Sequence, residues 1–439
     1  MNLPDKVVKV MKKFSDNNAE IFVVGGAVRD LMLGREVKDW DFATNILPDE
    51  MKKLFPKNSF CENVYGTFSI VLPGNEIFEV TTYRTEREYT DNRHPDKVEW
   101  GKSLKEDLER RDLTINSMAI DSEGNLSDIF GGKDDLNNRV VKTVGKPDDR
   151  FGEDALRMMR AVRIASQLQF IIEEKTFESI QQNAKLINKI AGERIWAELK
   201  LILMTNKPSD GMKLLKNSGL LIEIMPEILT GVDMAQKGHH IYDVFTHSLE
   251  ALNNCQSANP VTRLAALLHD VGKPVVAKGD GELRTFYAHD VVGSRIAVKI
   301  GKRLKFSNKE LDQLFRLVRW HMFTVEDTQT DKAVRRFIRN VTPEYLEDMI
   351  AVRRADRVGS GSKETSWRWE LFKNRVIEVQ KQPFAITDLK VDGKDVMEIL
   401  NIKPGRKVGD VLKSLFAEVE NDVSLNQKEI LIEKIKLFL

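Results

Sequence analysis

The sequence has few cysteines and almost no excess charge. Only Cys61 and Cys255 occur among its 439 residues, and neither lies in a metal-ligand cluster. Two thiols cannot form a disulfide framework, which indicates a reducing compartment, and we expect the cytoplasm. The 68 Lys and Arg residues nearly balance 67 Asp and Glu residues. This balance excludes a uniformly basic nucleic-acid coat protein, but it allows a nucleic-acid partner if basic residues gather on one face.

Long apolar runs, repeats and low-complexity segments are also absent. No run approaches the ~18–20 apolar residues that a membrane helix needs, so we expect no membrane association. Residues 1–14 lack the apolar core of a signal peptide. With 41% hydrophobic and 31% charged residues, the chain can instead bury sizeable cores. At the usual ~100–200 residues per domain, its length predicts about three domains.

The pattern of apolar residues changes near residue 147. Before it, short apolar stretches predict strands at 21–24, 68–72 and 77–80, and a short helix at 48–54. After it, apolar residues recur every three or four positions, which is typical of amphipathic helices. These helices are expected at 153–170, 177–190, 193–204, 245–252, 261–268, 311–318 and 345–356. A turn-rich piece at 391–409 precedes a last pair of helices. The sequence therefore predicts an α+β head followed by a long helical body.

A glycine pair and an aspartate pair occur close together in the head. Gly25 and Gly26 follow the first predicted strand, where backbone N–H groups can approach an anion and the next helix adds its dipole. Arg29, one turn into that helix, can reach phosphate oxygens. Asp39 and Asp41 are two apart, so in a strand they point to one side and can bind Mg²⁺. Each motif alone also fits a tight turn or a solvated strand end, but their spacing favours a nucleotide site.

Four further motifs follow in order along the chain. They are 110–116 (RRDLTIN), 128–136 (DIFGGKDDL), 153–163 (EDALRMMRAVR) and 193–199 (ERIWAEL). Together with the two pairs above, they resemble the class II tRNA nucleotidyltransferase and bacterial poly(A) polymerase family, within the polymerase-β-like nucleotidyltransferase superfamily. The resemblance implies a polymerase-β-like head, with a small mixed sheet and helices, followed by an all-α neck, body and tail.

The resemblance also implies roles for head residues. The glycine pair and Arg29 would contact the triphosphate, and Asp39 and Asp41 would hold the catalytic Mg²⁺ ions. Glu79 is a candidate third carboxylate, the alternative being an exposed strand residue. The residues that would hold the ribose and phosphates are Arg110, Arg111, Asp112 and Asn116. Their alternative is an ordinary charged turn.

Asp154 and Arg157 are the residues that the resemblance connects with base selection. Three apart on a predicted helix, they are expected to face the same way. A carboxylate accepts from the exocyclic amine of cytosine or adenine and a guanidinium donates to the ring acceptor, whereas uracil and guanine present a carbonyl. An unmet buried polar group costs ~1–3 kcal/mol, so the pair can select C and A without a nucleic-acid template. The alternative is a surface ion pair. Arg160 and Arg163 continue the stripe and are expected to meet the triphosphate.

The polar segment 85–108 resembles the flexible loop that the family uses to switch its pocket from C to A. Its full length argues against an enzyme that adds only CC. We interpret His94, within this segment, as a surface residue and not as a catalytic base.

Six of the seven histidines lie between His239 and His321. His247 is followed by an apolar helix that ends in His269 and Asp270, and Asp356 can supply a last carboxylate. This ligand set suits Mn²⁺, Ni²⁺ or Fe. The pattern resembles the HD phosphohydrolase superfamily, which implies hydrolysis of phosphate esters at RNA ends; the alternative is a structural helix bundle without turnover. For His289 and His321, satisfied core histidines are favoured over a second metal site.

Segments 386–395 and 403–409 resemble the C-terminal domain of the tRNA-end-adding branch. Lys403, Arg406 and Lys407 could approach RNA phosphates, although a loop with Pro–Gly turn chemistry is the alternative. The motifs predict four parts: a nucleotidyltransferase head (1–147), a neck with the base-selecting helix (148–220), a body with the HD region (221–375) and a tRNA-binding tail (376–439).

The sequence thus predicts a CTP(ATP):tRNA nucleotidyltransferase that builds the 3′-terminal CCA on the tRNA acceptor arm with Mg²⁺. No protein partner is implied. Two enzymatic alternatives add only A or make poly(A). An alternative of another class is an HD-type RNA or nucleotide phosphohydrolase whose head only binds nucleotide. A non-enzymatic RNA-binding protein is a further class, against which the Asp39 and Asp41 pair argues.

Overall fold

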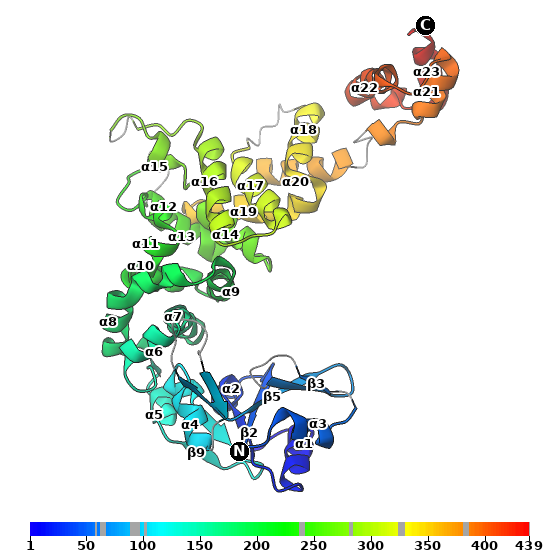
Figure 1. Cartoon of the computed structure of the whole chain (residues 1–439). Coiled ribbons are helices and arrows are strands. Elements are labelled where there is room, and N and C mark those ends of the chain that lie inside the picture. Colours follow the sequence, from blue (N-terminus) through cyan, green and yellow to red (C-terminus); the bar gives the residue numbers. More distant parts are fainter. Residues whose placement is uncertain are drawn as a thin grey trace. The chain divides into compact units, whose positions relative to one another are not determined.

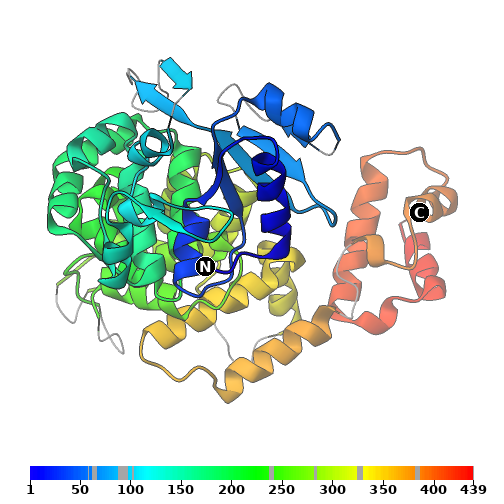
Figure 2. The ribbon, with the colours of Figure 1, turned by 90° about the horizontal axis from the view of Figure 1, so that it is seen from below.

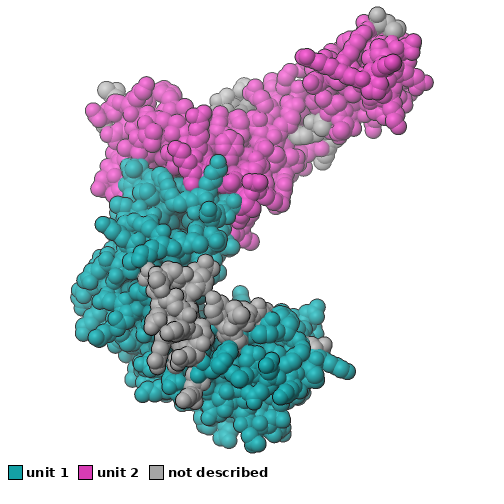
Figure 3. Space-filling view, in the orientation of Figure 1, with its two compact units in different colours: residues 1–230, 300–306 teal, residues 231–299, 307–439 magenta. Residues whose placement is uncertain are grey.

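The computed structural model describes residues 1–57, 59–61, 67–87, 97–100, 103–236, 242–280, 284–323, 330–380 and 386–438. The chain divides into two compact units (Figure 3). Unit 1 comprises residues 1–230 and 300–306, and unit 2 comprises residues 231–299 and 307–439. No helix in the described ranges is long and apolar enough to cross a membrane. The predicted four-part division is finer than these units and stays a prediction.

Unit 1 contains a mixed sheet of seven strands in the order β3-β4-β5-β2-β1-β8-β9 (Figure 1). The β2–β5 pair is parallel and the other neighbours are antiparallel. These strands are β1 (Ile21–Val24), β2 (Trp40–Thr44), β3 (Ser59–Cys61), β4 (Thr67–Val71), β5 (Ile77–Thr82), β8 (Met118–Ile120) and β9 (Leu126–Asp128). Two-stranded ladders join β6 (Arg84–Arg87) to β7 (Lys97–Trp100) and β10 (Val140–Val141) to β11 (Ile171–Ile172). The strands predicted at 21–24, 68–72 and 77–80 are confirmed as β1, β4 and β5. Strands β3 and β6 to β11 were not predicted, and β11 lies beyond residue 147, where no strand was expected.

Helices surround the sheet of unit 1 and continue beyond it. The α-helices are α1 (Asp5–Ser15), α2 (Gly26–Met32), α3 (Pro48–Leu54), α4 (Leu104–Glu109), α5 (Gly132–Asn137), α6 (Pro147–Glu153), α7 (Leu156–Leu168), α8 (Glu174–Asn183), α9 (Gly192–Leu203), α10 (Pro208–Asn217), α11 (Leu220–Ile224) and α12 (Pro226–Leu229). Short 3₁₀ helices lie at Thr114–Asn116 and Ala184–Lys189. Helix α7 packs against α9 and α10. Met158 and Val162 of α7 and Leu199 of α9 are fully buried.

The single helix predicted at 153–170 is wrong at its start. Helix α6 ends at Glu153, and Asp154 is extended with φ −142° and ψ 105° before α7 begins at Leu156. The Asp154 carboxylate accepts the N–H of Leu156 at 3.0 Å. Such a local side-chain bond competes with helical backbone bonding, and the helix is interrupted there.

Unit 2 is helical. Its α-helices are α13 (Val244–Asn254), α14 (Pro260–Leu268), α15 (Lys273–Val276), α16 (His289–Arg303, whose end from Ile300 belongs to unit 1), α17 (Asn308–Arg319), α18 (Asp331–Val341), α19 (Leu346–Gly359), α20 (Trp367–Gln380), α21 (Gly393–Leu400), α22 (Arg406–Asn421) and α23 (Lys428–Lys436). Short 3₁₀ helices lie at Pro343–Tyr345, Ile386–Asp388 and Val423–Leu425.

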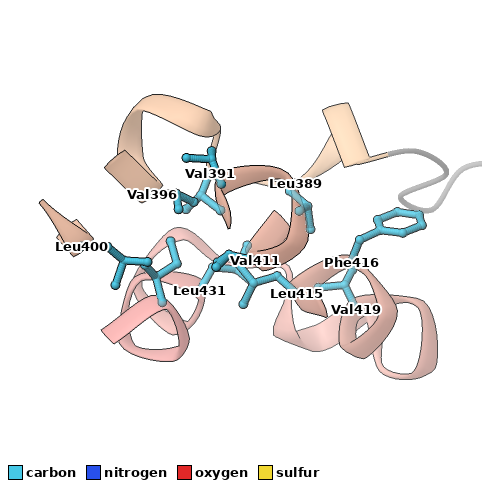
Figure 4. Packing of buried hydrophobic residues seen from close by; sticks show 11 residues of the cluster. Leu389, Val391, Val396, Leu400, Val411, Leu415, Phe416, Val419 and Leu431 are labelled. Carbon is cyan, nitrogen blue, oxygen red and sulfur yellow. The ribbon is translucent and has the colours of Figure 1, made fainter. Parts of the chain in front are cut away.

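The last helices, α21 to α23, form a group with a core of its own (Figures 2 and 4). Val396, Leu415 and Leu431 are fully buried in this core. The predicted last pair of helices is confirmed as α22 and α23, but the piece predicted as turn-rich contains α21. This helix forms because the Asp392 side chain caps it, accepting the N–H groups of Lys394 and Asp395.

Candidate active site and histidine cluster

The end of β1 places the glycine pair beside the aspartate pair in unit 1. Val24 lies opposite Asp41 in the β1–β2 register. The chain then turns at Gly25, whose φ of 73° is one that residues with a side chain rarely adopt. A Cβ at Gly25 would lie 3.0 Å from Nη1 of Arg111 and 3.7 Å from Oδ2 of Asp41. The turn therefore brings bare backbone against both charged groups.

The candidate metal carboxylates are Asp41 in β2, Asp39 directly before β2, and Glu79 in β5. Asp41 lies in β2, whereas Asp39 lies just before the strand, so only Asp41 fulfils the expectation of a strand residue. Burial and, less strongly, the charge of Asp39 raise the pKa of Asp41, while Arg111 opposes them. Glu79 of β5 is the register partner of Asp41 on a parallel strand, so both side chains leave the same face of the sheet. Clustered carboxylate oxygens suit a hard divalent ion.

A cavity of about 760 Å³ adjoins these carboxylates. Asp39, Asp41 and Arg29 line it together with Arg163 and Gln167 of α7. The cavity therefore combines a candidate cation site with guanidinium groups suited to phosphate oxygens. Sequence reasoning missed Gln167, although its spacing of four residues from Arg163 places it on the same helix face.

A chain of polar contacts connects the turn after β1 with α7. Arg29 donates from Nη1 to Oδ1 of Asn116 at 2.8 Å, and the Asn116 amide lies 3.5 Å from Oδ1 of Asp112. Arg160 of α7 contacts Oδ2 of the same aspartate at 3.4 Å. Burial would raise the pKa of Asp112, but Arg160 and Arg157 outweigh it and lower the pKa. Asp112 is therefore an ionised link between sheet and helix.

Asp107 holds two predicted nucleotide-binding arginines. Its side chain is fully buried and pairs with Arg110 at 2.6 Å and Arg111 at 3.0 Å. Burial would raise its pKa, but the two guanidinium groups outweigh burial and lower the pKa. Both arginines are thus oriented by a buried carboxylate, and their contact with ribose and phosphates stays a prediction. Sequence reasoning gave Asp107 no role.

The backbone N–H of Arg157 donates to the Asp154 carbonyl at 3.0 Å, but neither residue is among the described residues that line the cavity. The argument that both share one helix face is wrong, because Asp154 precedes α7. Arg194 of α9 donates to Asp154 at 2.8 Å. Arg157 pairs with Glu153 and donates to the Arg110 carbonyl at 3.0 Å. Neither side chain is turned into solvent, since Arg157 is 7% exposed and the Asp154 side chain 14%.

Glu198 is a positioning residue that the sequence motif contained without an assigned role. It is 7% exposed on α9 and accepts from Arg160 at 3.3 Å and from Arg163 at 2.6 Å. The sequence signal that could have identified it is an acidic residue among the apolar positions of a predicted helix, namely Ile195, Leu199 and Ile202. It orients the two arginines that α7 presents.

The four predicted HD ligands converge in unit 2. Nε2 of His247 (α13) lies 3.1 Å from Nε2 of His269, which ends α14, and 3.2 Å from Oδ1 of Asp356 (α19). Nε2 of His269 lies 3.1 Å from Oδ2 of Asp270. None of the four residues is more than 8% exposed. A buried set of two imidazoles and two carboxylates fits a divalent transition metal.

Charge within this cluster is strongly coupled. Burial would lower the pKa of His269, but Asp270 and then Asp356 outweigh it and raise the pKa to about 10. Burial would raise the pKa of Asp270, which His269 and Lys273 hold well below its usual value. The cluster therefore holds two ionised carboxylates, which are oxygen ligands for a cation.

His94 and most of the loop expected at 85–108 lie outside the described residues, and so do His239 and His240. Within that segment the described parts form β6, β7 and α4.

Comparisons with known proteins agree with this arrangement. Residues 21–142 match the family described as "Poly A polymerase head domain", residues 169–230 "Probable RNA and SrmB- binding site of polymerase A", and residues 244–359 "HD domain". The chain is 32% identical over 442 residues to the CCA-adding enzyme of Ligilactobacillus salivarius (strain UCC118), covering 100% of this chain and 98% of that protein. It is 48% identical over 199 residues to the CCA-adding enzyme of Lactobacillus helveticus (strain DPC 4571), covering 45% and 50%.

The fold comparison gives the same result. The crystal structure of the Bacillus stearothermophilus CCA-adding enzyme in complex with CTP has a TM-score of 0.73 and 28% sequence identity, and covers 100% of this chain and 98% of that one. The predicted α+β class, with a polymerase-type head and a helical body, is confirmed. With whole-length similarity above 30% identity, the chain belongs to the family of CCA-adding enzymes.

Proposed function

We propose that this protein adds C, C and A to the 3′ end of tRNA from CTP and ATP without a nucleic-acid template. The observation that carries the proposal is the cavity in which Asp39 and Asp41 face Arg29 and Arg163. The cytoplasm, where tRNA matures, is the location we propose with it.

Asp39 and Asp41, with Glu79 beside them, would hold the divalent metal of this site. Their oxygen-only donor set fits such an ion, and we propose Mg²⁺. When bound, the ion supplies charge neutralisation at the triphosphate and lowers the pKa of the attacking hydroxyl.

The arginines of the site would bind the triphosphate. Arg29 and Arg163 line the cavity, and Arg111 reaches the turn at Gly25. In the reaction, the terminal 3′-oxygen of the RNA bonds to the α-phosphorus as the bond to the bridging α–β oxygen breaks. Pyrophosphate leaves with its charge against these guanidinium groups, and the hydroxyl proton passes to solvent.

Base selection would require Asp154 and Arg157 to exchange partners. In the structure, Arg194 pairs with Asp154 and Glu153 pairs with Arg157. A cytosine or adenine edge offers an amine to the carboxylate and a ring nitrogen to the guanidinium, replacing both partners. A uracil or guanine edge presents a carbonyl to the carboxylate and cannot replace both partners. Binding either base would therefore break the ion pairs without replacing them.

The tRNA would be gripped through its backbone. Lys403, Arg406 and Lys407 are exposed at the start of α22, where they can meet phosphates of any tRNA sequence. This placement supports the predicted role of the tail.

Incubating the protein with tRNA lacking its last three nucleotides, CTP and ATP, and sequencing the product ends, tests the proposal. We expect CCA and no extension beyond it. Addition of A alone, or of long A tracts, would contradict it and favour the A-adding or poly(A) alternative.

A second activity, hydrolysis of phosphate esters, is favoured by the convergence of His247, His269, Asp270 and Asp356 in unit 2. A water oxygen would bond to phosphorus while the bond from phosphorus to the ribose oxygen breaks, and the ribose oxygen would take the proton that water loses. Release of inorganic phosphate from RNA ending in a 3′-phosphate measures it. No release after loading with Mn²⁺, Ni²⁺ or Fe²⁺ would refute this activity.

A further inference from the structure

The group formed by α21 to α23 (the tail group, residues 386–438) is held together by its own apolar core. Every buried residue of this core, and every partly buried apolar residue packed against it, belongs to residues 386–438 (Figure 4). The core therefore fixes the three helices to one another, but it does not fix the direction of the tail group against the rest of unit 2.

Polar contacts between α18 and the last turn of α22 supply such a connection. The guanidinium of Arg335 donates to the backbone carbonyl of Glu420, and Nη2 of Arg339 lies 2.7 Å from Oε1 of the same residue. The two arginines are four positions apart, so they project from one face of α18. Arg335 is 4% exposed and Glu420 is 7% exposed. One residue of the tail group is therefore bound through both its backbone and its side chain.

The position of Glu420 in α22 explains why it takes these partners. The last four carbonyl groups of an α-helix have no partner within the helix, and Arg335 provides one for the carbonyl of Glu420. A carboxylate near the negative end of the helix dipole is unfavourable by itself, and burial adds to this cost. The positive charges of Arg335 and Arg339 compensate for both. The contact with α18, and not the helix itself, therefore accounts for a buried acid at this position.

Helix α18 is itself anchored to α20, the helix that precedes the tail group in the chain. The ring centroids of Phe337 (α18) and Phe372 (α20) lie 5.5 Å apart in an edge-to-face arrangement. Arg375 of α20 donates to Asp331 of α18 at 2.7 Å. The two arginines that contact Glu420 thus connect the tail group to a helix whose own position is fixed.

Helix α22 transmits the position of Glu420 to the basic residues at its other end. At 1.5 Å per residue, Arg406 at the start of α22 lies about 21 Å from Glu420. A rotation of about 20° at Glu420 would move that start by about 7 Å, which is more than twice the length of a hydrogen bond. Lys403, Arg406 and Lys407 would then miss the RNA phosphates that they are proposed to meet.

We propose that Arg335, Arg339 and Glu420 are positioning residues for tRNA: they fix the direction of α22, so that the basic residues at its start reach the tRNA backbone. This inference rests on the proposed role of the tail in binding tRNA and adds the residues that preorganise the tail group. Preorganisation raises affinity because less freedom is lost on binding. The contact should therefore lower KM for tRNA and leave the chemical step unchanged.

Charge reversal and charge exchange test the proposal in the full-length protein. Glu420→Arg places a third guanidinium beside Arg335 and Arg339, so KM for tRNA lacking its CCA end should rise about 10-fold. We expect kcat and KM for CTP to stay within about twofold of the native values. The double variant Arg339→Glu, Glu420→Arg restores an ion pair with exchanged charges, and KM for tRNA should return to within about threefold of native. Glu398→Arg, an equal charge change at an exposed position of α21, is the control and should leave this KM unchanged.

Pulsed electron paramagnetic resonance measures the direction of α22 without tRNA. Spin labels are placed at Arg336→Cys and Lys413→Cys, exposed positions of α18 and α22, in protein that carries Cys61→Ser. Burial raises the pKa of the Cys255 thiol to about 12, which keeps this cysteine from taking the label. We expect a narrow distance distribution in this protein, a broader one after Glu420→Arg, and a narrow one again after the charge exchange.

The outcomes separate this inference from the proposed function. If alanine at Lys403, Arg406 and Lys407 raises KM for tRNA, but Glu420→Arg changes neither KM nor the distance distribution, the inference is overturned and tRNA binding by the tail stands. If the alanine variant leaves KM unchanged while Glu420→Arg broadens the distribution, the fixed direction of α22 is supported and its use in tRNA binding is contradicted.

A variant that fails to fold does not leave the proposal undecided. If Glu420→Arg does not fold, as judged by circular dichroism, Glu420→Gln takes its place in both measurements. A broad distance distribution in the labelled protein with Glu420 intact overturns the inference by itself.

Discussion

The two candidate metal centres of this chain differ in ligand chemistry and in burial. In unit 1 the ligands are carboxylates at the edge of a large cavity, and Asp39 is exposed. In unit 2 they are two imidazoles and two carboxylates, and His247 and His269 are at most 1% exposed. Oxygen ligands on an open cavity suit an ion that arrives and leaves with a triphosphate. Buried nitrogen ligands suit an ion that stays in the protein.

The centres also differ in what orients their ligands. In unit 1 the register of neighbouring strands places Asp41 and Glu79 on one face. In unit 2 the ring of His269 is turned by a carbonyl three residues earlier. The first device depends on long-range strand pairing and the second on local helical geometry. We therefore expect changes at one centre to leave the other intact.

The largest expected effect is the loss of nucleotide addition in Asp41→Asn. Because metal ligation supplies several kcal/mol of transition-state stabilisation, CTP incorporation should fall by about 10³-fold. Phosphate release from RNA 3′-phosphates should stay within about twofold of the native rate. The exposed Asp49→Asn on α3 is the control. A comparable fall in both activities would contradict the expectation that the two centres act independently.

A smaller loss is expected for Gly25→Ala. The new Cβ would be strained at φ 73° and would lie 3.0 Å from Arg111, so incorporation should fall about 10- to 100-fold, mainly through KM for CTP. Gly34→Ala is a matched control, because its φ of 64° is also positive but nothing lies within 4 Å. Equal losses of activity in the two variants would show that strain, and not the approach to Arg111, is responsible.

Base discrimination should change without loss of the metal site in Asp154→Ala. The preference for CTP over UTP should fall about 10- to 100-fold, since ~1–3 kcal/mol of selective pairing is removed. Competition between the two nucleotides on tRNA ends measures it, with the exposed Asp149→Ala on α6 as control. An unchanged CTP/UTP ratio would show that residues other than Asp154 select the base.

The last prediction concerns the stability of unit 1 and its pH dependence, and not an activity. The pKa of Asp107 is lowered in the folded protein by Arg110 and Arg111, so its ionised form stabilises the fold above the unfolded pKa of about 4. This contribution is lost as pH falls below that value toward the lower folded pKa. Asp107→Asn should cost about 3 kcal/mol at pH 7 and weaken the decline in stability under acid.

Urea unfolding at pH 7 and pH 3.5 measures this effect. Asp210→Asn, which changes an exposed pair 4.0 Å from Lys213, should alter stability by no more than about 0.5 kcal/mol. An equal pH dependence in native protein and Asp107→Asn would contradict the assignment.

Features encoded by local pattern were predicted well from the sequence. The bounds of β1 (Ile21–Val24) and α3 (Pro48–Leu54) agree with their predictions because apolar spacing and a leading proline determine them. Features that depend on distant partners were missed. At the helix break, the Asp154 carboxylate accepts a hydrogen bond from Arg194, which is 40 residues away in the sequence.

The candidate sites show the same limit. The types and order of ligands were readable in the sequence, but the direction in which His289 and His321 point was not. Only the folded helices show that both rings face Asp270. Likewise, Asp107 and Glu198 act by orienting arginines, a role that neither residue type nor spacing reveals.

The crystal structure of the full-length protein with CTP and Mg²⁺ tests the central claim most directly. We expect the triphosphate and metal at Asp39 and Asp41, and the cytosine edge at Asp154 and Arg157, released from Arg194 and Glu153. A cytosine bound away from Asp154 and Arg157, with their present ion pairs unchanged, would contradict the account.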